Sequence, residues 1–146
     1  MPHTFANLLT HIVFSTKDRA PLIKPETRPR LHAYLGGIVR EEQGTAFAVN
    51  GTADHVHLLV SLPPALSLAD AMRVLKTNSS RWMNAAQRAP FAWQSGYGAF
   101  SVSRSNAGAV SQYIARQEEH HRKISFREEF IAFLRKHEIE FDERQI

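Results

Sequence analysis

The chain has 146 residues, of which 18 are Lys or Arg and 14 are Asp or Glu, and its formal net charge at pH 7 is +4. A domain of this size buries about 68–70% of the surface of its unfolded chain, so we expect a single domain over residues 1–146. The sequence contains no cysteine, which excludes disulfide bonds and thiolate chemistry. The basic excess is compatible with a polyanionic partner such as a nucleic acid.

The first residues of the chain carry polar side chains, including His3, Asn7 and His11, and therefore lack the apolar core of a signal peptide. No apolar run approaches the about 18 residues that a membrane-spanning helix needs. The absence of cysteine fits a reducing compartment. We therefore expect a cytoplasmic protein that does not associate with a membrane.

The first half of the chain alternates strand and helix patterns. Residues 7–16 are rich in β-branched and aromatic side chains and predict a strand. Residues 30–43 carry apolar side chains at helical spacing and predict a helix that stops at Gly44. Residues 45–50 and 55–62 predict two strands, and the short turn between them is typical of an antiparallel hairpin.

The second half continues with helices and one further strand region. Ser67 predicts the N-cap of a second helix. Residues 91–103 predict one or two strands that are interrupted by glycines. Ser105 or Asn106 is expected to cap a third helix that runs to about His121, and Ser125 is expected to cap a fourth.

The resulting order is strand, helix, strand, strand, helix, strand and C-terminal helices. It predicts an α+β fold of the ferredoxin-like (RRM-like) kind, with an antiparallel sheet and helices on one face. The other face is then left for function or for an additional helix. A C-terminal helix carries Tyr113.

Two histidines alternate in the third predicted strand. His55 and His57 lie two residues apart in the apolar segment 54–60, so both side chains point to the same face of a sheet. A single strand histidine is usually a hydrogen-bonded, half-buried side chain. Two imidazoles on one face favour a metal site instead.

Tyr113 and Gln117 lie one turn apart on the third predicted helix and share its side. Two imidazoles and one amide oxygen would hold a divalent cation and leave positions for a phosphate oxygen. The tyrosine hydroxyl would then be in range for in-line attack on that phosphate. A tyrosine ester conserves the free energy of the phosphodiester, so a second DNA hydroxyl could displace the enzyme and reseal the strand. The sequence shows no general base beside the tyrosine.

Five segments follow one another in an order that is specific as a set. They are His-Ile-Val-Phe-Ser-Thr-Lys at 11–17, Asp-His-Val-His-Leu-Leu-Val at 54–60, Trp-Gln-Ser-Gly-Tyr-Gly-Ala-Phe-Ser-Val at 93–102, Tyr-Ile-Ala-Arg-Gln at 113–117, and His-His-Arg-Lys at 120–123 followed by Ser-Phe-Arg-Glu-Glu-Phe at 125–130. With these segments the chain resembles the single-tyrosine HUH transposases of small bacterial insertion sequences, including those associated with repetitive extragenic palindromes. The resemblance covers nearly the whole length.

The resemblance implies roles for particular residues. His55 and His57 correspond to the paired histidine ligands, Gln117 to the third ligand, and Tyr113 to the nucleophile that becomes joined to the 5′ phosphate of cut single-stranded DNA. It also implies Mg²⁺ or Mn²⁺ as the metal, a homodimer, and recognition of DNA hairpins at the ends of a mobile element. Ligand chemistry alone would also allow Zn²⁺.

Other histidines and tyrosines are weaker candidates. His11 could face the site, but a plain strand histidine is the favoured interpretation. His120 and His121 are alternative ligands, although a basic helix end is favoured for them. Tyr34 is expected among core positions, and Tyr97 is expected to be structural or to contact DNA.

Five basic residues are candidate DNA contacts on residue type alone. They are Lys17, Arg19, Arg73, Lys76 and Arg81. Two alternatives to a DNA-cleaving transposase stay open. One is a non-catalytic module that binds a nucleic-acid hairpin on a ferredoxin-like sheet, and the other is a metal-dependent phosphoesterase that uses water.

Overall fold

The structure is a computed structural model, and it describes residues 3–146. Within these residues the strands are β1 (Leu9–Ser15), β2 (Thr45–Gly51), β3 (His55–Ser61) and β4 (Gly98–Ser101). The α-helices are α1 (Arg28–Glu41), α2 (Leu68–Gln87), α3 (Ala107–Ala115), α4 (Gln117–His120) and α5 (Phe126–Lys136). Short 3-10 turns are η1 (Lys17–Arg19), η2 (Arg104–Asn106) and η3 (Glu143–Gln145). No helix of residues 3–146 has the length and apolar composition needed to cross a bilayer.

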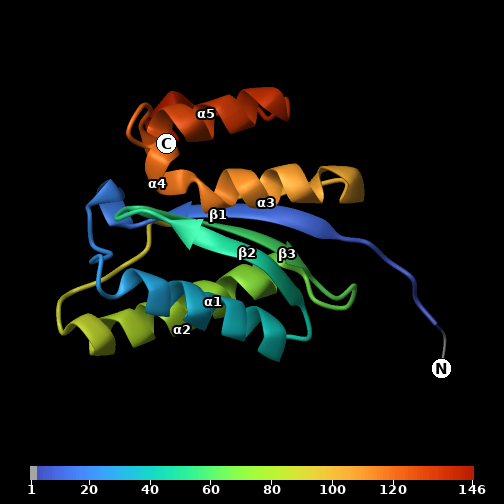
Figure 1. The fold of residues 1–146 in the computed structure, drawn as a ribbon, viewed down its shortest axis with the longest axis horizontal. Helices are drawn as coiled ribbons and strands as arrows, with labels where there is room; N and C mark the ends of the chain where they lie inside the picture. Colours follow the sequence, from blue (N-terminus) through green and yellow to red (C-terminus); the bar gives the residue numbers. More distant parts are fainter. Residues whose placement is uncertain (1–2) are drawn as a thin grey trace.

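The strands form one antiparallel sheet in the order β2-β3-β1-β4, with β1 and β3 in the centre. Helices α1 and α2 cover one face, and α3, α4 and α5 lie over the other (Figure 1). This arrangement confirms the predicted α+β, ferredoxin-like fold. The sheet face that was predicted to serve function or to carry an additional helix is covered by helices from the last third of the chain.

The face under α1 and α2 is the larger apolar core. Alternate residues of the central strands point to it. Ile12 of β1 and Val56 and Leu58 of β3 are fully buried there, packed with Leu35 of α1 and Leu75 of α2. The other alternate residues of the same strands therefore face α3, α4 and α5.

The second face carries both histidines of β3. In the sheet register His57 lies opposite Val13, and His55 lies opposite Ser15, so these side chains share one side of the sheet. Val13 joins a smaller apolar cluster with Leu134 of α5. The histidines are thus enclosed between the sheet and the C-terminal helices.

Two of the three predicted N-caps are confirmed by side-chain hydrogen bonds, whereas Asn106 precedes α3 without such a bond. The Ser67 hydroxyl accepts a hydrogen bond of 3.1 Å from the Asp70 amide at the start of α2. At the start of α5, the Ser125 hydroxyl accepts from the Glu128 amide, and the Glu128 carboxylate accepts from Ser125 in return, which completes a capping box. This box fixes where α5 begins, and with it the helix that closes over the histidines.

The prediction of one helix over residues 106–121 is wrong, because the helix breaks at Arg116. The Asn50 side-chain amide on β2 donates to the carbonyls of Ile114 at 2.9 Å and Ala115 at 3.1 Å. These carbonyls would accept from the amides one turn later in a continuous helix, so the bond from β2 competes with helix propagation. The break turns Gln117 into the sheet, where its side chain is fully buried.

Candidate metal centre and tyrosine site

His55 is held in one orientation by an acidic neighbour. Its Nδ1 lies 2.7 Å from Asp54 Oδ1 and 3.0 Å from the Thr52 hydroxyl. Burial raises the pKa of Asp54, but the hydrogen bond from His55 outweighs burial and keeps the pKa below its ordinary value. Because an ionised carboxylate only accepts, the His55 Nδ1–H donates to it, and a neutral His55 presents the lone pair of Nε2 on its other side.

Gln117 completes this side of the site. Its Oε1 lies 3.1 Å from His55 Nε2 and 3.0 Å from His121 Nε2. His55 Nε2 and Gln117 Oε1 are both lone-pair atoms, fully buried, that face each other across hydrogen-bond distance. A divalent cation that accepts both lone pairs would relieve this contact, so the donor set present fits a metal ion.

Glu129 of α5 lies at the centre of the cluster and was missed in the sequence. Its Oε1 lies 2.9 Å from His57 Nε2 and 3.2 Å from His121 Nε2, and its Oε2 lies 3.3 Å from His120 Nε2. Burial raises the pKa of Glu129, but the hydrogen bonds from His121 and His57 outweigh it and depress the pKa far below its ordinary value. Glu129 is therefore a buried, ionised carboxylate.

The histidines around Glu129 respond differently to their surroundings. Burial lowers the pKa of His57 to about 4, although Glu129 opposes this shift. For His121 burial also acts to lower the pKa, but the hydrogen bond and charge of Glu129 outweigh burial and raise it. His57 is thus neutral at pH 7, whereas the proton on His121 is stabilised.

Four side chains can offer one ligand atom each to a single ion. They are His55, His57, His121 and Glu129, and their ligand atoms lie within 4.8 Å of one another. Gln117 Oε1 borders the same space. The predicted ligands His55, His57 and Gln117 are thus brought together from β3 and α4, and His121 joins them instead of forming only a basic helix end.

Tyr113 reaches this cluster from α3. Its hydroxyl donates a hydrogen bond to Glu129 Oε2 and lies 3.2 Å from His120 Nε2. Burial and then the hydrogen bond to Glu129 raise the pKa of Tyr113 above its ordinary value of 10. The tyrosine is therefore protonated at neutral pH, with a carboxylate in contact with its proton.

His11 of β1 extends the cluster behind His57. It is 2% exposed, and its Nε2 lies 2.8 Å from His57 Nδ1. Burial and the neighbouring His57 lower the pKa of His11 to about 3. His11 therefore contacts a candidate metal ligand. The interpretation of His11 as a plain strand histidine did not predict this contact.

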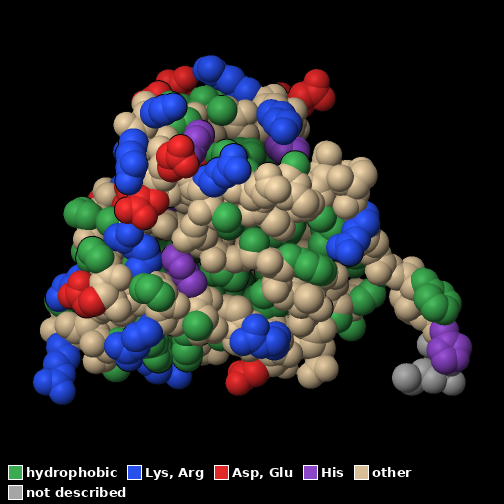
Figure 2. Space-filling view, viewed as in Figure 1, with side chains coloured by type: hydrophobic (Ala, Val, Ile, Leu, Met, Phe, Trp, Pro, Cys, Tyr) green, Lys and Arg blue, Asp and Glu red, His purple; other side chains and the backbone are tan. Residues whose placement is uncertain are grey.

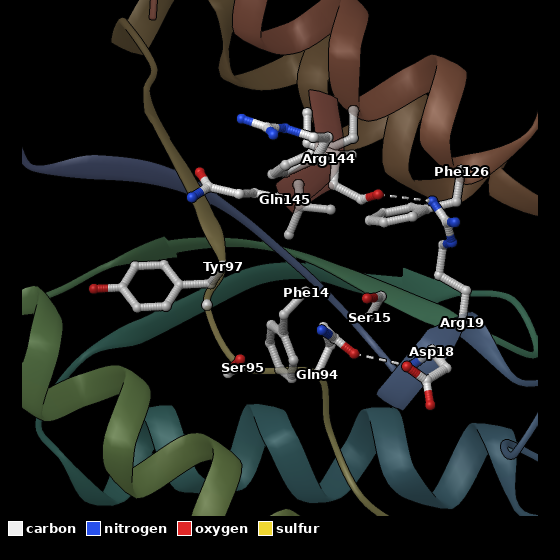
Figure 3. Close-up of a pocket in the computed structure, with 14 residues that line it drawn as sticks. Phe14, Ser15, Asp18, Arg19, Gln94, Ser95, Tyr97, Phe126, Arg144 and Gln145 are labelled. Atoms are coloured by element: carbon white, nitrogen blue, oxygen red, sulfur yellow. Dashed lines mark hydrogen bonds between the residues drawn. The ribbon is translucent and has the colours of Figure 1, made fainter. Parts of the chain in front are cut away.

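A cavity of about 400 Å³ adjoins the cluster (Figure 3). It opens where residues 94–97 leave the sheet, between an isolated bridge from Thr16 to Trp93 and the start of β4. Phe126 lines the cavity, and its ring lies 4.6 Å from that of His55 between centroids. Phe126 thus lies both at the cavity wall and beside His55.

The five basic candidates for DNA contact do not all lie on one side of the structure. Arg19 lines the cavity, where its guanidinium donates to the Ile146 carbonyl oxygen at 3.5 Å (Figure 3), and exposed Lys17 lies in the same turn η1. Lys76 donates to the backbone oxygens of residues 94 and 96 at 2.7 and 2.6 Å.

Arg73 and Arg81 are exposed on α2, which packs on the opposite face of the sheet. Figure 2 shows Lys and Arg side chains spread over both helical layers of one face of the molecule, with Asp and Glu among them. Charge alone therefore does not identify a path for DNA.

The fold and the site define an α+β domain whose sheet carries a candidate metal centre beside a tyrosine. The family model for IS200-like transposases matches residues 4–117. The chain belongs to the IS200-like transposase family, and it is a transposase. The match includes Tyr113 and ends at Gln117, so His121 and Glu129 lie beyond it.

Individual relatives agree with this assignment. The chain is 28% identical over 126 residues to the transposases for insertion sequence element IS200 of Salmonella typhimurium and Salmonella typhi, covering 82% of this chain and 82% of theirs. It is 25% identical to a solved candidate transposase from Deinococcus radiodurans R1, with a TM-score of 0.64 over 80% of this chain and 95% of that one.

A more distant structure shows the same fold. It is a REP-associated tyrosine transposase bound to a REP hairpin, 14% identical, with a TM-score of 0.60 over 83% of this chain and 72% of that one.

Proposed function

We propose that this transposase cleaves and rejoins single-stranded DNA through a covalent link between Tyr113 and the 5′ phosphate. The observation that carries the proposal is the convergence of the Tyr113 hydroxyl with His57 and His121 on one buried carboxylate, Glu129. These residues come from four separate segments of the chain. A buried polar network of this kind, next to a cavity, is typical of a reactive site.

The cation that we propose is Mg²⁺ or Mn²⁺, held by His55, His57 and Gln117, with Glu129 as a further donor and His121 as another once its Nε2 proton is lost. When bound, it would stabilise charge on the phosphate under attack. The carboxylate and amide oxygens suit either ion, whereas the imidazoles would also suit Zn²⁺.

The residues of the chain perform the transfer itself. The Tyr113 oxygen forms a bond to phosphorus, and the tyrosine proton passes to Glu129 Oε2, which already accepts it in a hydrogen bond. The bond from phosphorus to the 3′ oxygen breaks, and the departing oxygen takes up a proton from solvent to become a 3′ hydroxyl. In the reverse direction a free 3′ hydroxyl attacks phosphorus, and the tyrosine recovers its proton. Glu129 is thus the proton acceptor that the sequence did not reveal.

The remaining features of the proposal rest on the family resemblance and the related structures. We propose that residues 1–146 act as one domain, that the substrate is single-stranded DNA with hairpins at the ends of an element, and that the protein works as a homodimer. The distant relative that was solved with a REP hairpin supports a hairpin partner.

Cleavage can be tested with single-stranded oligonucleotides that carry hairpins near their ends, incubated with Mg²⁺ or Mn²⁺. We expect a protein–DNA adduct that survives denaturing electrophoresis. Binding without an adduct over a broad panel of hairpins would favour a non-catalytic binding module. Cleavage without any adduct would favour a phosphoesterase that uses water.

From the position of Arg19 beside the cavity we predict that DNA runs along the cavity. Arg19→Ala should weaken binding of single-stranded DNA for all sequences and reduce the slope of log affinity against log salt by about 0.7, because one phosphate contact is lost. Arg73→Ala, on the opposite face of the sheet, is the matched comparison. An equal effect of the two substitutions would contradict a DNA path along the cavity.

A further inference from the structure

The Gln94 side chain brings unused hydrogen-bond donors to the cavity beside Phe126. Its Oε1 accepts from the Asp18 backbone amide at 2.8 Å, and its own backbone amide donates to the Ser15 carbonyl at 2.9 Å. Because a backbone amide only donates, the side-chain atom that faces Asp18 must be the oxygen. The Nε2 group is then the other branch of the amide, and it donates to no atom of residues 3–146.

Ser15 of β1 is a second polar group at this cavity. Its side chain is only 8% exposed, and it lines the cavity. Within the part of the chain that the structure describes, its hydroxyl has no hydrogen-bond partner. A buried hydroxyl without a partner costs free energy, so a partner from outside the protein is expected. In Figure 3, Ser15 and Gln94 lie between Tyr97 on one side and Arg19 on the other.

The remaining walls of the cavity suit a flat, uncharged ring attached to a phosphate. Phe126 and Phe130 line it, and their rings are stacked at 5.6 Å between centroids. Two arginines, Arg19 and Arg144, line it with a single acid, Asp18, among residues 3–146. Its volume of about 400 Å³ is within the range of sites for small organic groups. Unpaired bases bind to proteins by stacking on aromatic rings and by hydrogen bonds to their edges.

Both segments that hold Gln94 are fixed before any ligand arrives. The Lys76 ammonium donates to the carbonyls of Gln94 at 2.7 Å and Gly96 at 2.6 Å, and Gly96 has a φ of 86°. On the other side, Asp18 and Arg19 have φ values of 57° and 55°. Two consecutive non-glycine residues in the left-handed region are strained, and such strain persists where surrounding contacts hold it, often at binding sites. Gln94 is thus held between two constrained segments.

We infer that the cavity receives one unpaired base of the single-stranded DNA, that Gln94 Nε2 donates to a carbonyl oxygen of this base, and that Lys76 is a positioning residue for Gln94. The inference rests on the proposed function, because it assigns part of the DNA substrate to this cavity. The Ser15 hydroxyl is a second contact to the same base.

The donor at Gln94 favours one class of base. Guanine carries a carbonyl oxygen at O6 and thymine at O4, where adenine and cytosine carry an amino group. An amino group would meet the Gln94 Nε2 group donor to donor. Guanine or thymine is therefore the expected occupant.

Base preference can be measured with hairpin oligonucleotides that carry a randomised single-stranded flank. The Tyr113→Phe protein with Mg²⁺ is suitable, because it is expected to bind DNA without cleaving it, and the bound fraction is sequenced. At one flank position we expect guanine or thymine to be enriched about 3- to 10-fold over adenine and cytosine, the effect of one hydrogen bond. An abasic nucleotide there should weaken binding by about fivefold or more, because stacking is lost. A flank without base preference, or without an effect of the abasic nucleotide, would overturn the inference.

Gln94→Glu separates Gln94 from other contacts with the flank. The carboxylate keeps an oxygen for the Asp18 amide but replaces the donor with an acceptor. At the selected position the preference should therefore change to adenine or cytosine. Gln43→Glu, at an exposed residue between α1 and β2, adds the same charge elsewhere and should leave the preference unchanged. A preference for guanine or thymine that persists in Gln94→Glu would show that Gln94 does not contact the base.

Ser15→Ala tests the second contact. It should weaken binding of the selected oligonucleotide by about threefold, because one hydrogen bond is lost. Binding of the matching abasic oligonucleotide should not change. An equal loss for both oligonucleotides would contradict a contact between Ser15 and the base.

Lys76→Met tests the positioning role. It keeps the length of the side chain but loses both hydrogen bonds to the loop at 94–97, so the base preference should fall to about twofold or less. The slope of log affinity against log salt should stay the same. If Lys76 instead contacted a phosphate, all sequences would bind more weakly and the slope would fall by about 0.7, which would overturn the positioning role. Lys76→Gln, which keeps a donor, is the second variant to measure if Lys76→Met fails to fold.

Failure of the inference can be distinguished from failure of the proposed function. A base preference that Gln94→Glu reverses, in a protein whose unchanged form makes no DNA adduct, would support the base site and count against the proposed function. An adduct without any base preference would overturn the base site alone. No binding of any hairpin oligonucleotide would overturn both.

Discussion

Tyr113→Phe is expected to abolish the covalent protein–DNA adduct and to lower strand cleavage by about a thousandfold or more, because it removes the only atom that forms the bond to phosphorus. The phenyl ring keeps the packing of α3 against the sheet, so the fold and the binding of hairpin DNA should persist. Denaturing electrophoresis of labelled oligonucleotides measures the adduct, and a binding titration measures the affinity.

The matched control is Tyr97→Phe. Tyr97 is 40% exposed at the cavity rim, and the Lys76 ammonium lies 6.0 Å from its ring centroid. Loss of its hydroxyl should leave the adduct intact. If Tyr113→Phe retains cleavage while His57→Ala abolishes it, water is the nucleophile and the proposed function is wrong.

The parts of the site that the sequence predicted depend on local rules. His55 and His57 share a face because side chains alternate in any strand, and Ser125 caps α5 because a serine before an apolar helical pattern is a favoured N-cap. Neither inference requires knowledge of a distant segment. Both are therefore correct without the fold.

The parts of the site that could not be predicted from the sequence depend on contacts between segments that are far apart in the chain. At the helix break, the carbonyls of Ile114 and Ala115 accept from Asn50, which is 64 residues from Ile114 in the chain. No helical pattern predicts this break, although the spacing of Tyr113 and Gln117 did predict that both reach the site. Helical periodicity assumes that each carbonyl is free to accept from its own helix, and here the carbonyls of Ile114 and Ala115 also accept from β2.

Glu129 did leave a signal in the sequence. It lies one turn from Phe126 and from Phe133, so a carboxylate falls on the apolar side of an amphipathic helix. A buried acid at such a position needs hydrogen-bond donors, and the nearby histidine pair at 120 and 121 supplies them. Only the fold shows that His57 and Tyr113 reach the same carboxylate.

Glu129→Gln is expected to have the largest effect on the metal-free protein. It removes the charge that His57, His121 and Tyr113 share but keeps the size of the side chain, and it should lower the free energy of unfolding at pH 7 by about 3 kcal/mol. Because the pKa of Glu129 is depressed, this stabilisation is fully present above the unfolded value of 4.5 and is lost as pH falls. Urea unfolding of both proteins should therefore give free energies of unfolding whose difference narrows from about pH 5 toward pH 3.

The same substitution should change the ionisation of Tyr113. Burial, the largest cause of its raised pKa, persists in Glu129→Gln, but the hydrogen bond to the carboxylate and its charge disappear. The pKa of Tyr113 should therefore fall but stay above 10. Ultraviolet absorbance measures the titration of the tyrosines. The chain has 3 tyrosines, and comparison with Tyr113→Phe identifies the contribution of Tyr113. Glu119→Gln, an exposed acid on α4, is the control. An unchanged tyrosine titration in Glu129→Gln would show that Glu129 does not affect the ionisation of Tyr113. It would also contradict the proposal that Glu129 accepts the tyrosine proton.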